Sequence, residues 1–280
     1  MTATTTGTPT SAVRLPSTLR VGLARGAVEL KQFFRQRDAV VFTFAFPAFI
    51  ALMLGLIFDE PAHGAPDVAV SQVFVVGMIA YGIVSTAFIS VGVGIALDRE
   101  DGTLKRLRGT PASAVAYFLG KICLVAASTA GGIALLLAVG VLLFDLRLPT
   151  DPGRWLTFGW LLALSVVACT LLGIAASALA RSAKSAPAVL NLPAIALQFV
   201  SGIFVLNDAL PEEMVRVASF FPVKWMGQGF RSVFLPDGMM VQEAAGSWEH
   251  GRTALVLGAW CLGGLLLCLL TFRWTGRESR

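Results

Sequence analysis

Six long apolar stretches constrain this chain more than any other feature of its sequence. A helix needs roughly 20 apolar residues to cross a hydrocarbon core about 30 Å thick, and each stretch reaches that length. Leu, Ala, Gly and Val dominate the stretches without alternating with polar residues at period two, which predicts helices. The predicted spans are Ala39–Phe58, Gln72–Leu97, Ala116–Phe144, Trp155–Ala180, Ala186–Leu206 and Thr253–Phe272.

The composition leaves little room for a soluble domain. Of the 280 residues, 56% are hydrophobic and only 14% are charged, whereas about 25% are charged in an average soluble domain. We therefore predict an all-α polytopic membrane protein, with a six-helix transmembrane domain over residues 39–272 and a tail over residues 273–280. The net charge of +5 needs no nucleic-acid partner, because basic residues also face anionic membrane lipids and cytoplasmic subunits.

The basic residues predict the orientation. Lys and Arg resist translocation, whereas Asp and Glu contribute little. Under the six-span topology, sixteen basic residues lie on the side of the two termini and six on the other side. Both termini are therefore predicted to be cytoplasmic, in a multi-pass protein of the cytoplasmic (inner) membrane. The first span is expected to be a retained helix, because 38 residues precede it and no small-residue cleavage site follows.

The leader before the first span divides into two parts. Residues 1–17 are rich in Thr, Ser and Pro and are expected to be disordered. Residues 18–38 carry an apolar stripe at helical spacing, with basic residues mostly off that stripe, which suits an amphipathic helix in the membrane interface. The alternative is an ordinary helix packed on protein. The stripe consists of Leu19, Leu23, Ala27, Leu30 and Phe34.

The link between the second and third spans, residues 98–111, packs seven charges into a short cytoplasmic segment. Leu104 and Leu107 lie three residues apart, on a short helix that we expect to begin near Thr103 and to end before Pro111. Such a helix would present an apolar ridge with charged flanks to a cytoplasmic partner. A solvated connector, rich in charge for its location alone, is the alternative.

Span five differs from the others because it is interrupted and polar. Pro193 predicts a kink, and the polar groups of Asn191, Gln198 and Ser201 need partners other than lipid. These three residues are candidates for a substrate path. Hydrogen bonding within the helix bundle would explain them equally well. The stretch that follows mixes aromatic residues with prolines, which predicts short amphipathic helices that dip into the outer membrane face.

The 98–111 segment resembles the signature of ABC-2 type permeases, a family that includes drug, antibiotic and polysaccharide exporters. This resemblance implies a coupling helix, which sits in a groove of a nucleotide-binding subunit and transmits ATP-driven motion to the membrane helices. Lys105 departs from the pattern, since many members have an acidic residue there. The matching residues, which become candidate ATPase-coupling residues, are Arg99, Glu100, Gly102, Thr103, Leu104, Leu107, Thr110 and Pro111.

A second resemblance to the same family follows span five and implies an extracytoplasmic re-entrant hairpin over residues 207–236. Val205 and Leu206 depart from the family's pattern, which usually has a Phe-Pro pair there. The leader, the spans, the coupling segment and the hairpin follow the family's order over essentially the whole chain. The candidate hairpin residues are Gly202, Phe204, Pro211, Pro222 and Arg231.

Catalytic and metal-binding patterns are missing from the sequence. Gly120-Lys121 is its only Gly-Lys pair and lacks the upstream glycine of a P-loop, so we expect no ATP site by that motif. We predict no catalytic residue, because the sequence contains neither a nucleophile elbow nor a zinc-protease motif. The four cysteines form no CxxC pair and predict no metal site. ATP and magnesium would therefore bind to a separate ATPase subunit.

The resemblance implies the permease subunit of an ATP-driven exporter. Its expected partners are a cytoplasmic ATPase subunit, a second permease copy that is identical or paralogous, and membrane lipids. The expected cargo is amphipathic or hydrophobic: a drug or antibiotic, a lipid or a glycolipid. The rival hypothesis is a non-transporting membrane scaffold or sensor subunit, which predicts no copurifying ATPase.

Overall fold

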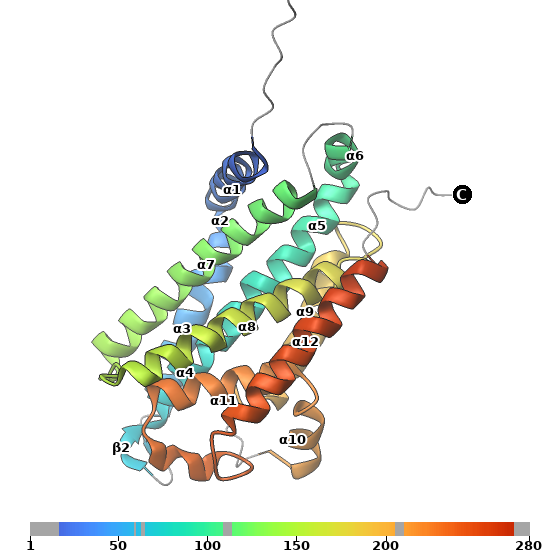
Figure 1. Cartoon of the computed structure of the whole chain (residues 1–280). Helices are drawn as coiled ribbons and strands as arrows, with labels where there is room; N and C mark the ends of the chain where they lie inside the picture. The colour runs from blue at the N-terminus through green and yellow to red at the C-terminus, as the bar shows by residue number, and fades with distance from the viewer. Residues whose placement is uncertain (1–16, 59, 63–64, 109–113, 205–209, 272–280) are drawn as a thin grey trace, which may run out of the picture.

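The computed structural model describes residues 17–58, 60–62, 65–108, 114–204 and 210–271, which form a bundle of long helices with short helices at both ends (Figure 1). The α-helices are α1 (Thr18–Arg35), α2 (Arg37–Val40), α3 (Phe46–Ile57), α4 (Val70–Ile83), α5 (Val91–Glu100), α6 (Thr103–Arg108), α7 (Ala114–Leu143), α8 (Pro152–Ala176), α9 (Ala186–Val200), α10 (Glu212–Ala218), α11 (Pro222–Phe234) and α12 (His250–Thr271). The remaining elements are the π-helices η1 (Val41–Ala45) and η2 (Val84–Ser90), the 3₁₀-helix η4 (Asp237–Gln242) and the strands β1 (Pro61–Ala62) and β2 (Ala65–Ala69).

Four helical stretches are long and apolar enough to cross a membrane: Val70–Glu100, Val115–Leu143, Pro152–Ala176 and His250–Thr271. They correspond to the second, third, fourth and sixth predicted spans. The first and fifth apolar helices are shorter than predicted, at Val41–Ile57 and Ala186–Val200. The fifth is short because its helix ends at Ser201, where φ is −99° and ψ is 7°. Six membrane crossings therefore remain a prediction.

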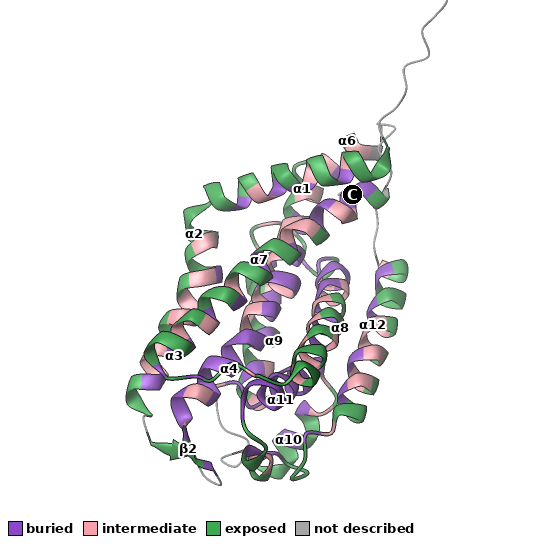
Figure 2. Ribbon diagram, turned by 60° about the vertical axis from the view of Figure 1, so that its left-hand side comes forward, coloured by how far each residue is buried: buried purple, intermediate pink, exposed green. Residues whose placement is uncertain are grey.

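Helix α1 lies across one end of the bundle (Figures 1 and 2). Ser17 caps its start by accepting a hydrogen bond from the Arg20 amide. The helix ends at Arg35 rather than at residue 38, because Gln36 leaves helical geometry before α2 begins. Gly22 and Gly26 face α7 closely. The predicted apolar stripe points away from the protein, since all its residues are exposed except Leu30, which is half-buried.

A two-stranded hairpin interrupts the all-α architecture. β1 and β2 pair antiparallel between α3 and α4, with Pro61 opposite Ala69 and Ala62 opposite Ala65. The all-α architecture predicted from the sequence did not include this hairpin. Buried Ala62, Ala65 and Val68 join the hairpin to the core at the end of the bundle opposite α1.

The central element is the continuous α4–η2–α5 helix. Eleven of the fourteen residues of α4 are buried, against α3, α7, α8 and α11. Helix α8 crosses η2 and α5 with their backbones very close together. A Cβ atom on Gly173 would lie 2.5 Å from the Phe88 carbonyl oxygen, and one on Gly92 would lie 2.9 Å from the Gly173 carbonyl oxygen. Small residues at these two positions therefore permit the helix crossing.

Candidate functional site

The coupling segment predicted from the sequence lies at the α1 end of the bundle (Figure 1). Helix α5 continues to Glu100, the chain turns at residues 101–102, and α6 begins at Thr103 as predicted. Gly102 makes this turn with φ of +70°, a conformation that favours glycine. The Arg106 guanidinium closes the turn by donating to the Asp101 carbonyl oxygen at 3.1 Å and to the Thr103 hydroxyl at 3.3 Å.

The two leucines of the segment do not form the outward ridge that the sequence predicted. Leu104 is only 1% exposed and belongs to the main core, and Leu107 is half-buried against that core. The exposed side of α6 carries Lys105 and Arg106 instead. Thr110 and Pro111, the last two candidate residues, lie outside the described residues.

Arg99 and Glu100 hold a second connector against the end of α5. The Arg99 guanidinium donates to the carbonyl oxygens of Ser177 at 3.0 Å and of Ala180 at 2.7 Å. The Glu100 carboxylate accepts a hydrogen bond from the Ala183 amide. Hydrogen bonds that involve an ionised group are the stronger kind. The first two residues of the signature thus fix the link between α8 and α9, residues 177–185, beside the 98–108 segment.

Sequence reasoning missed the 177–185 connector as part of this site. Its signal was weak: two basic residues among serines and alanines between two apolar helices. In the structure the connector and α6 together form a face that is rich in exposed basic side chains. These side chains belong to Lys105, Arg106, Arg181 and Lys184.

The predicted hairpin region lies at the opposite end of the bundle, where α11 runs across it (Figure 1). Gly202 turns the chain after α9 with φ of +77°. Its carbonyl oxygen accepts a hydrogen bond from the Arg231 guanidinium at 3.0 Å. A buried ion pair between Arg231 and Glu243, at 2.6 Å, completes this contact. The structure therefore brings together two predicted residues that are far apart in sequence, and adds Glu243.

The other predicted hairpin residues have local structural roles. Pro211 is the N-cap of α10, and Pro222 begins α11, where its lack of an amide hydrogen costs nothing. Phe204 packs its ring against those of Tyr81 and Phe199. Residues 205–209, which include Val205 and Leu206, lie outside the described residues.

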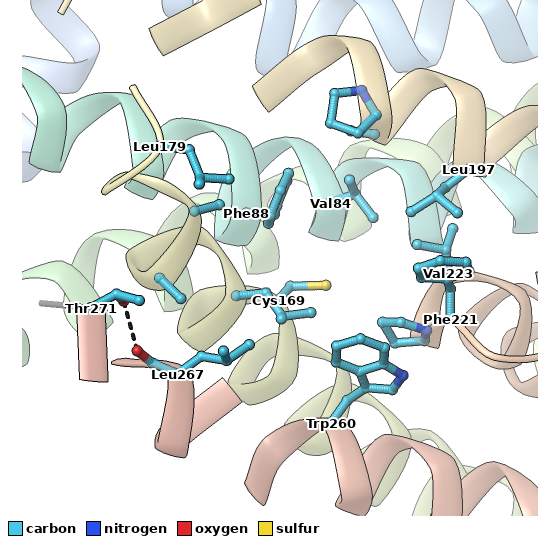
Figure 3. A pocket seen from close by; sticks show the side chains of 16 residues that line it. Val84, Phe88, Cys169, Leu179, Leu197, Phe221, Val223, Trp260, Leu267 and Thr271 are labelled. Carbon is cyan, nitrogen blue, oxygen red and sulfur yellow. Dashed lines mark hydrogen bonds between the residues drawn. The ribbon is translucent and has the colours of Figure 1, made fainter. Parts of the chain in front are cut away.

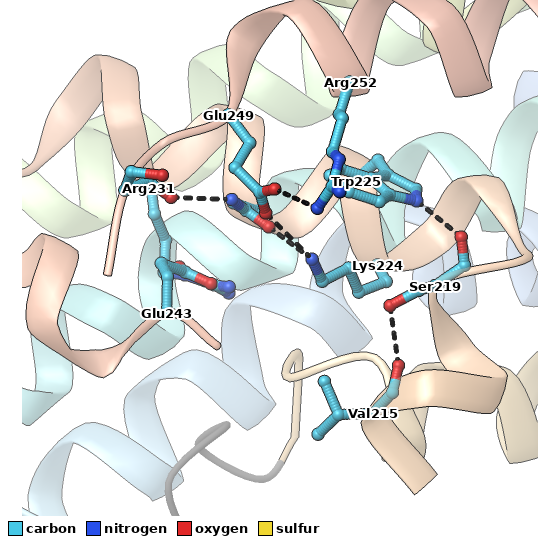
Figure 4. Close-up of polar contacts among 10 residues, drawn as sticks. Val215, Ser219, Lys224, Trp225, Arg231, Glu243, Glu249 and Arg252 are labelled. Atoms are coloured by element: carbon cyan, nitrogen blue, oxygen red, sulfur yellow. Dashed lines mark hydrogen bonds and ion pairs between the residues drawn. The ribbon is translucent and has the colours of Figure 1, made fainter. Parts of the chain in front are cut away.

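A second cluster of polar side chains surrounds Lys224 on α11 (Figure 4). The Lys224 ammonium donates to the Gln228 side chain at 2.6 Å, lies 4.0 Å from the Glu249 carboxylate and lies 3.8 Å from the Trp225 ring centre. Glu249 also pairs with Arg252 at 2.6 Å. Burial lowers the pKa of Lys224 from its ordinary 10.5, although Glu243 and Glu249 act in the opposite direction.

An apolar cavity of about 310 Å³ opens between η2, α8, α9, α11 and α12 (Figure 3). Val84 and Phe88 line it from η2, and the stacked rings of Phe221 and Trp260 lie at its other side. None of its lining residues is charged. A second cavity of about 510 Å³, also mainly apolar, lies between α7, α8 and α12.

The three predicted path residues do not line either cavity. The Asn191 amide donates to the Pro187 carbonyl oxygen within its own helix at 2.8 Å. Gln198 and Ser201 are fully buried, and their side-chain polar atoms have no hydrogen-bond partner among the described residues. Their role in a substrate path stays a prediction.

A comparison with protein families matches residues 26–235 to the model described as ABC-2 type transporter. The matched range begins within α1 and ends just after α11, so it contains both the coupling segment and Arg231. A search of curated proteins finds no significant match. On the family match, the chain belongs to the ABC-2 type transporter family.

Proposed function

We propose that this chain is the permease subunit of an ATP-driven exporter. A separate cytoplasmic subunit would bind ATP and magnesium and hydrolyse the nucleotide, and two permease copies would form the path through the cytoplasmic membrane. The α1 end, with α6 and the 177–185 connector, would face the cytoplasm. The family assignment supports this role, because ABC-2 permeases normally work with a nucleotide-binding ATPase subunit.

The observation that carries this proposal is the way Arg99 and Glu100 hold two connectors together. Their hydrogen bonds to residues 177–183 make the end of α5, the turn at Gly102 and the 177–185 connector one contact surface. A subunit that docks on α6 therefore also touches the link between α8 and α9. On this surface the exposed basic residues outnumber the exposed acidic ones, so its net charge is positive, which suits an acidic groove on the partner. The basic residues are Lys105, Arg106, Arg181 and Lys184, and the acidic ones are Glu100 and Asp101.

A displacement of α6 would travel along α5 to η2. Val84 and Phe88 of η2 line the 310 Å³ cavity, so a change in this segment changes the cavity wall. π-Helical segments are often found at functional sites within α-helices. Gly173 packs directly on the η2 backbone, so α8 would move with it. The 98–108 segment and the cavity are thereby parts of one mechanical path.

The cargo that fits this cavity is hydrophobic or amphipathic. Its lining is aliphatic and aromatic and lacks charged side chains, and such pockets favour ligands that bury apolar surface. A strongly charged cargo would lose its hydration without gaining an ionic partner at this cavity. A drug, a lipid or a glycolipid satisfies this requirement.

The test is coupled transport with Glu100→Gln and Arg99→Met. Each variant would be purified together with the ATPase subunit that copurifies with the unaltered chain and placed in lipid vesicles. ATP-dependent movement of the fluorescent amphipathic drug daunorubicin would be measured beside ATP hydrolysis. Both variants should lose most cargo-stimulated ATP hydrolysis, because the 177–185 connector is released. Glu213→Gln, an exposed carboxylate at the opposite end, is the matched control.

Two results would count against the proposal. Normal coupling in both variants, with intact assembly, would exclude the coupling role of Arg99 and Glu100. Absence of any ATPase that copurifies with the unaltered chain would exclude the permease role and favour a scaffold or sensor subunit.

A further inference from the structure

Lys121 is a buried cation that the coupling segment described above does not include. It lies in α7, in the Gly-Lys pair that lacks a P-loop context, and is only 5% exposed. Its ammonium contacts two carboxylates on two other helices: Glu29 of α1 at 2.8 Å and Asp98 of α5 at 2.9 Å. One side chain therefore joins three helices.

Two further side chains complete this cluster. The Tyr117 hydroxyl, one turn before Lys121 on α7, donates to the same Asp98 carboxylate at 2.8 Å. Arg25 of α1 pairs with Glu29 at 3.2 Å, and its guanidinium lies 4.7 Å from the Tyr117 ring centre. Two cations and two carboxylates face one another, so the cluster is neutral and leaves no net charge to attract an ionic ligand.

Stability alone gives a weak reason for this arrangement. Removing two or more charges from water is costly, and apolar residues of similar volume often stabilise a fold equally well or better. In some proteins, buried polar or ionic groups instead fix the register between the elements that carry them. The register fixed here is that of α1, α5 and α7 at the end of the bundle where α6 lies.

The packing around Lys121 shows which helices the ionic cluster connects. Helices α1 and α7 already pack tightly, since a Cβ on Gly26 would lie 2.7 Å from the Cys123 Cβ. The coupling helix does not pack on them in the same way. Leu107 faces α1 and α7 across a cavity of about 300 Å³. Helix α7 packs most extensively on α1 and α4 and less on α3, η1 and η2, and side chains bridge it to the end of α5.

We propose that Lys121 is a positioning residue that links the coupling segment to the α1–α7 pair, so that the amphipathic helix moves with α6 when the ATPase acts. Asp98 lies two residues before Glu100, at the start of the 98–108 segment. Its carboxylate pairs with the Lys121 ammonium and accepts the hydrogen bond from the Tyr117 hydroxyl. The cavity beside Leu107 leaves space for α6 to shift, and the ionic contact carries that shift to α1. This role rests on the proposed function.

Two single substitutions separate the two sides of the link. Asp98→Asn removes the α5 carboxylate and leaves Lys121 paired with Glu29. Glu29→Gln removes the α1 carboxylate and leaves Lys121 paired with Asp98. Because each variant keeps one partner for the buried cation, both should fold. Lys121→Arg keeps the charge and serves as the conservative rescue variant, and Glu213→Gln again serves as the remote control.

The measurement is the distance between spin labels on exposed positions of α1 and of the turn that leads into α6, Lys31→Cys and Asp101→Cys, in a chain whose four native cysteines are replaced. In lipid nanodiscs without ATPase, the unaltered, Lys121→Arg and Glu213→Gln chains should give one narrow distance distribution. Asp98→Asn and Glu29→Gln should broaden it. With the ATPase trapped by ADP and vanadate, the distance should stay constant in the first group and shift in the second.

The outcomes are distinguishable. Equal distributions in all variants, with or without ATPase, would overturn the role of Lys121 while leaving the permease function intact. A distance between the two labels that changes on trapping in the unaltered chain would also overturn it. If no ATPase binds the unaltered chain, the proposed function fails, and the linking role fails with it.

Discussion

The buried pair of Arg231 and Glu243 offers the sharpest test of the fold at the end of the bundle where α11 lies. Both side chains are at least 95% buried, their charged atoms are 2.6 Å apart, and Arg231 also donates to the Gly202 carbonyl oxygen. Arg231→Met leaves the Glu243 carboxylate buried without this cation. Removing one partner of a buried pair typically costs about 3 to 5 kcal/mol. For a chain of this size, that lowers the melting temperature by roughly 6 to 20 °C.

The assay is thermal unfolding of purified protein in detergent, followed by tryptophan fluorescence. Trp225 and Trp248 are both buried at this end of the bundle and report on the region directly. The double variant Arg231→Met with Glu243→Leu should recover most of the loss, because replacing both members of a buried pair by apolar residues is often neutral. The comparison separates the effect of removing the Arg231 cation from that of the lost packing.

Arg216→Met is the matched control. Arg216 pairs with Glu213 at 3.1 Å, but both side chains are mostly exposed, and such pairs contribute about 0 to 1 kcal/mol. The reasoning would be refuted if Arg231→Met lowered the melting temperature no more than Arg216→Met. It would also be refuted if the double variant were as unstable as Arg231→Met alone.

Three further measurements test other parts of the structure. Gly173→Val should destabilise the folded protein by about 1 to 3 kcal/mol, because its Cβ would lie 2.5 Å from an η2 carbonyl oxygen. Gly159→Ala on the same helix places its Cβ in open space and should leave the stability unchanged. Equal melting curves for the two variants would contradict the close crossing of α8 and η2. The lowered pKa of Lys224 means that the unfolded chain holds a proton in the alkaline range below 10.5 that the folded chain has released, so stability should rise with pH there. Lys224→Met should abolish that rise. If the stability of Lys224→Met and of the unaltered chain depended on pH in the same way, Lys224 would not be its cause. A membrane-impermeant thiol reagent should label Asp67→Cys but not Lys105→Cys from outside intact cells, in a cysteine-free background; the reverse pattern would invert the topology.

Local chemistry explains which parts of the candidate site could be predicted from the sequence. Gly102 followed by Thr103 placed the start of α6 correctly, because a positive φ and a helix start depend on neighbouring residues. Four of the six predicted spans match helices long enough to cross a membrane, since length and hydropathy are properties of each segment alone.

The parts that could not be predicted depend on contacts between distant segments. Nothing near Arg99 or Glu100 in sequence indicates that their partners lie about 80 residues later, in the 177–185 connector. The inward direction of Leu104 was equally hidden, because the side of a two-turn helix that faces the core depends on how the neighbouring helices pack. The hairpin of β1 and β2 escaped prediction because its residues carry no clear strand pattern.

The arrangement of the charged side chains indicates where this bundle can change shape. Ionic clusters hold its two ends: Glu29, Asp98 and Lys121 at one, Arg231 and Glu243 at the other. The α4–η2–α5 helix runs from the end where α11 lies to the coupling segment, and its η2 segment lines the 310 Å³ cavity midway. Because both ends are fixed by strong contacts, the irregular hydrogen bonding of η2 is where this helix can bend at least cost. A push at α6 would therefore appear at the cavity wall rather than dissipate at either end.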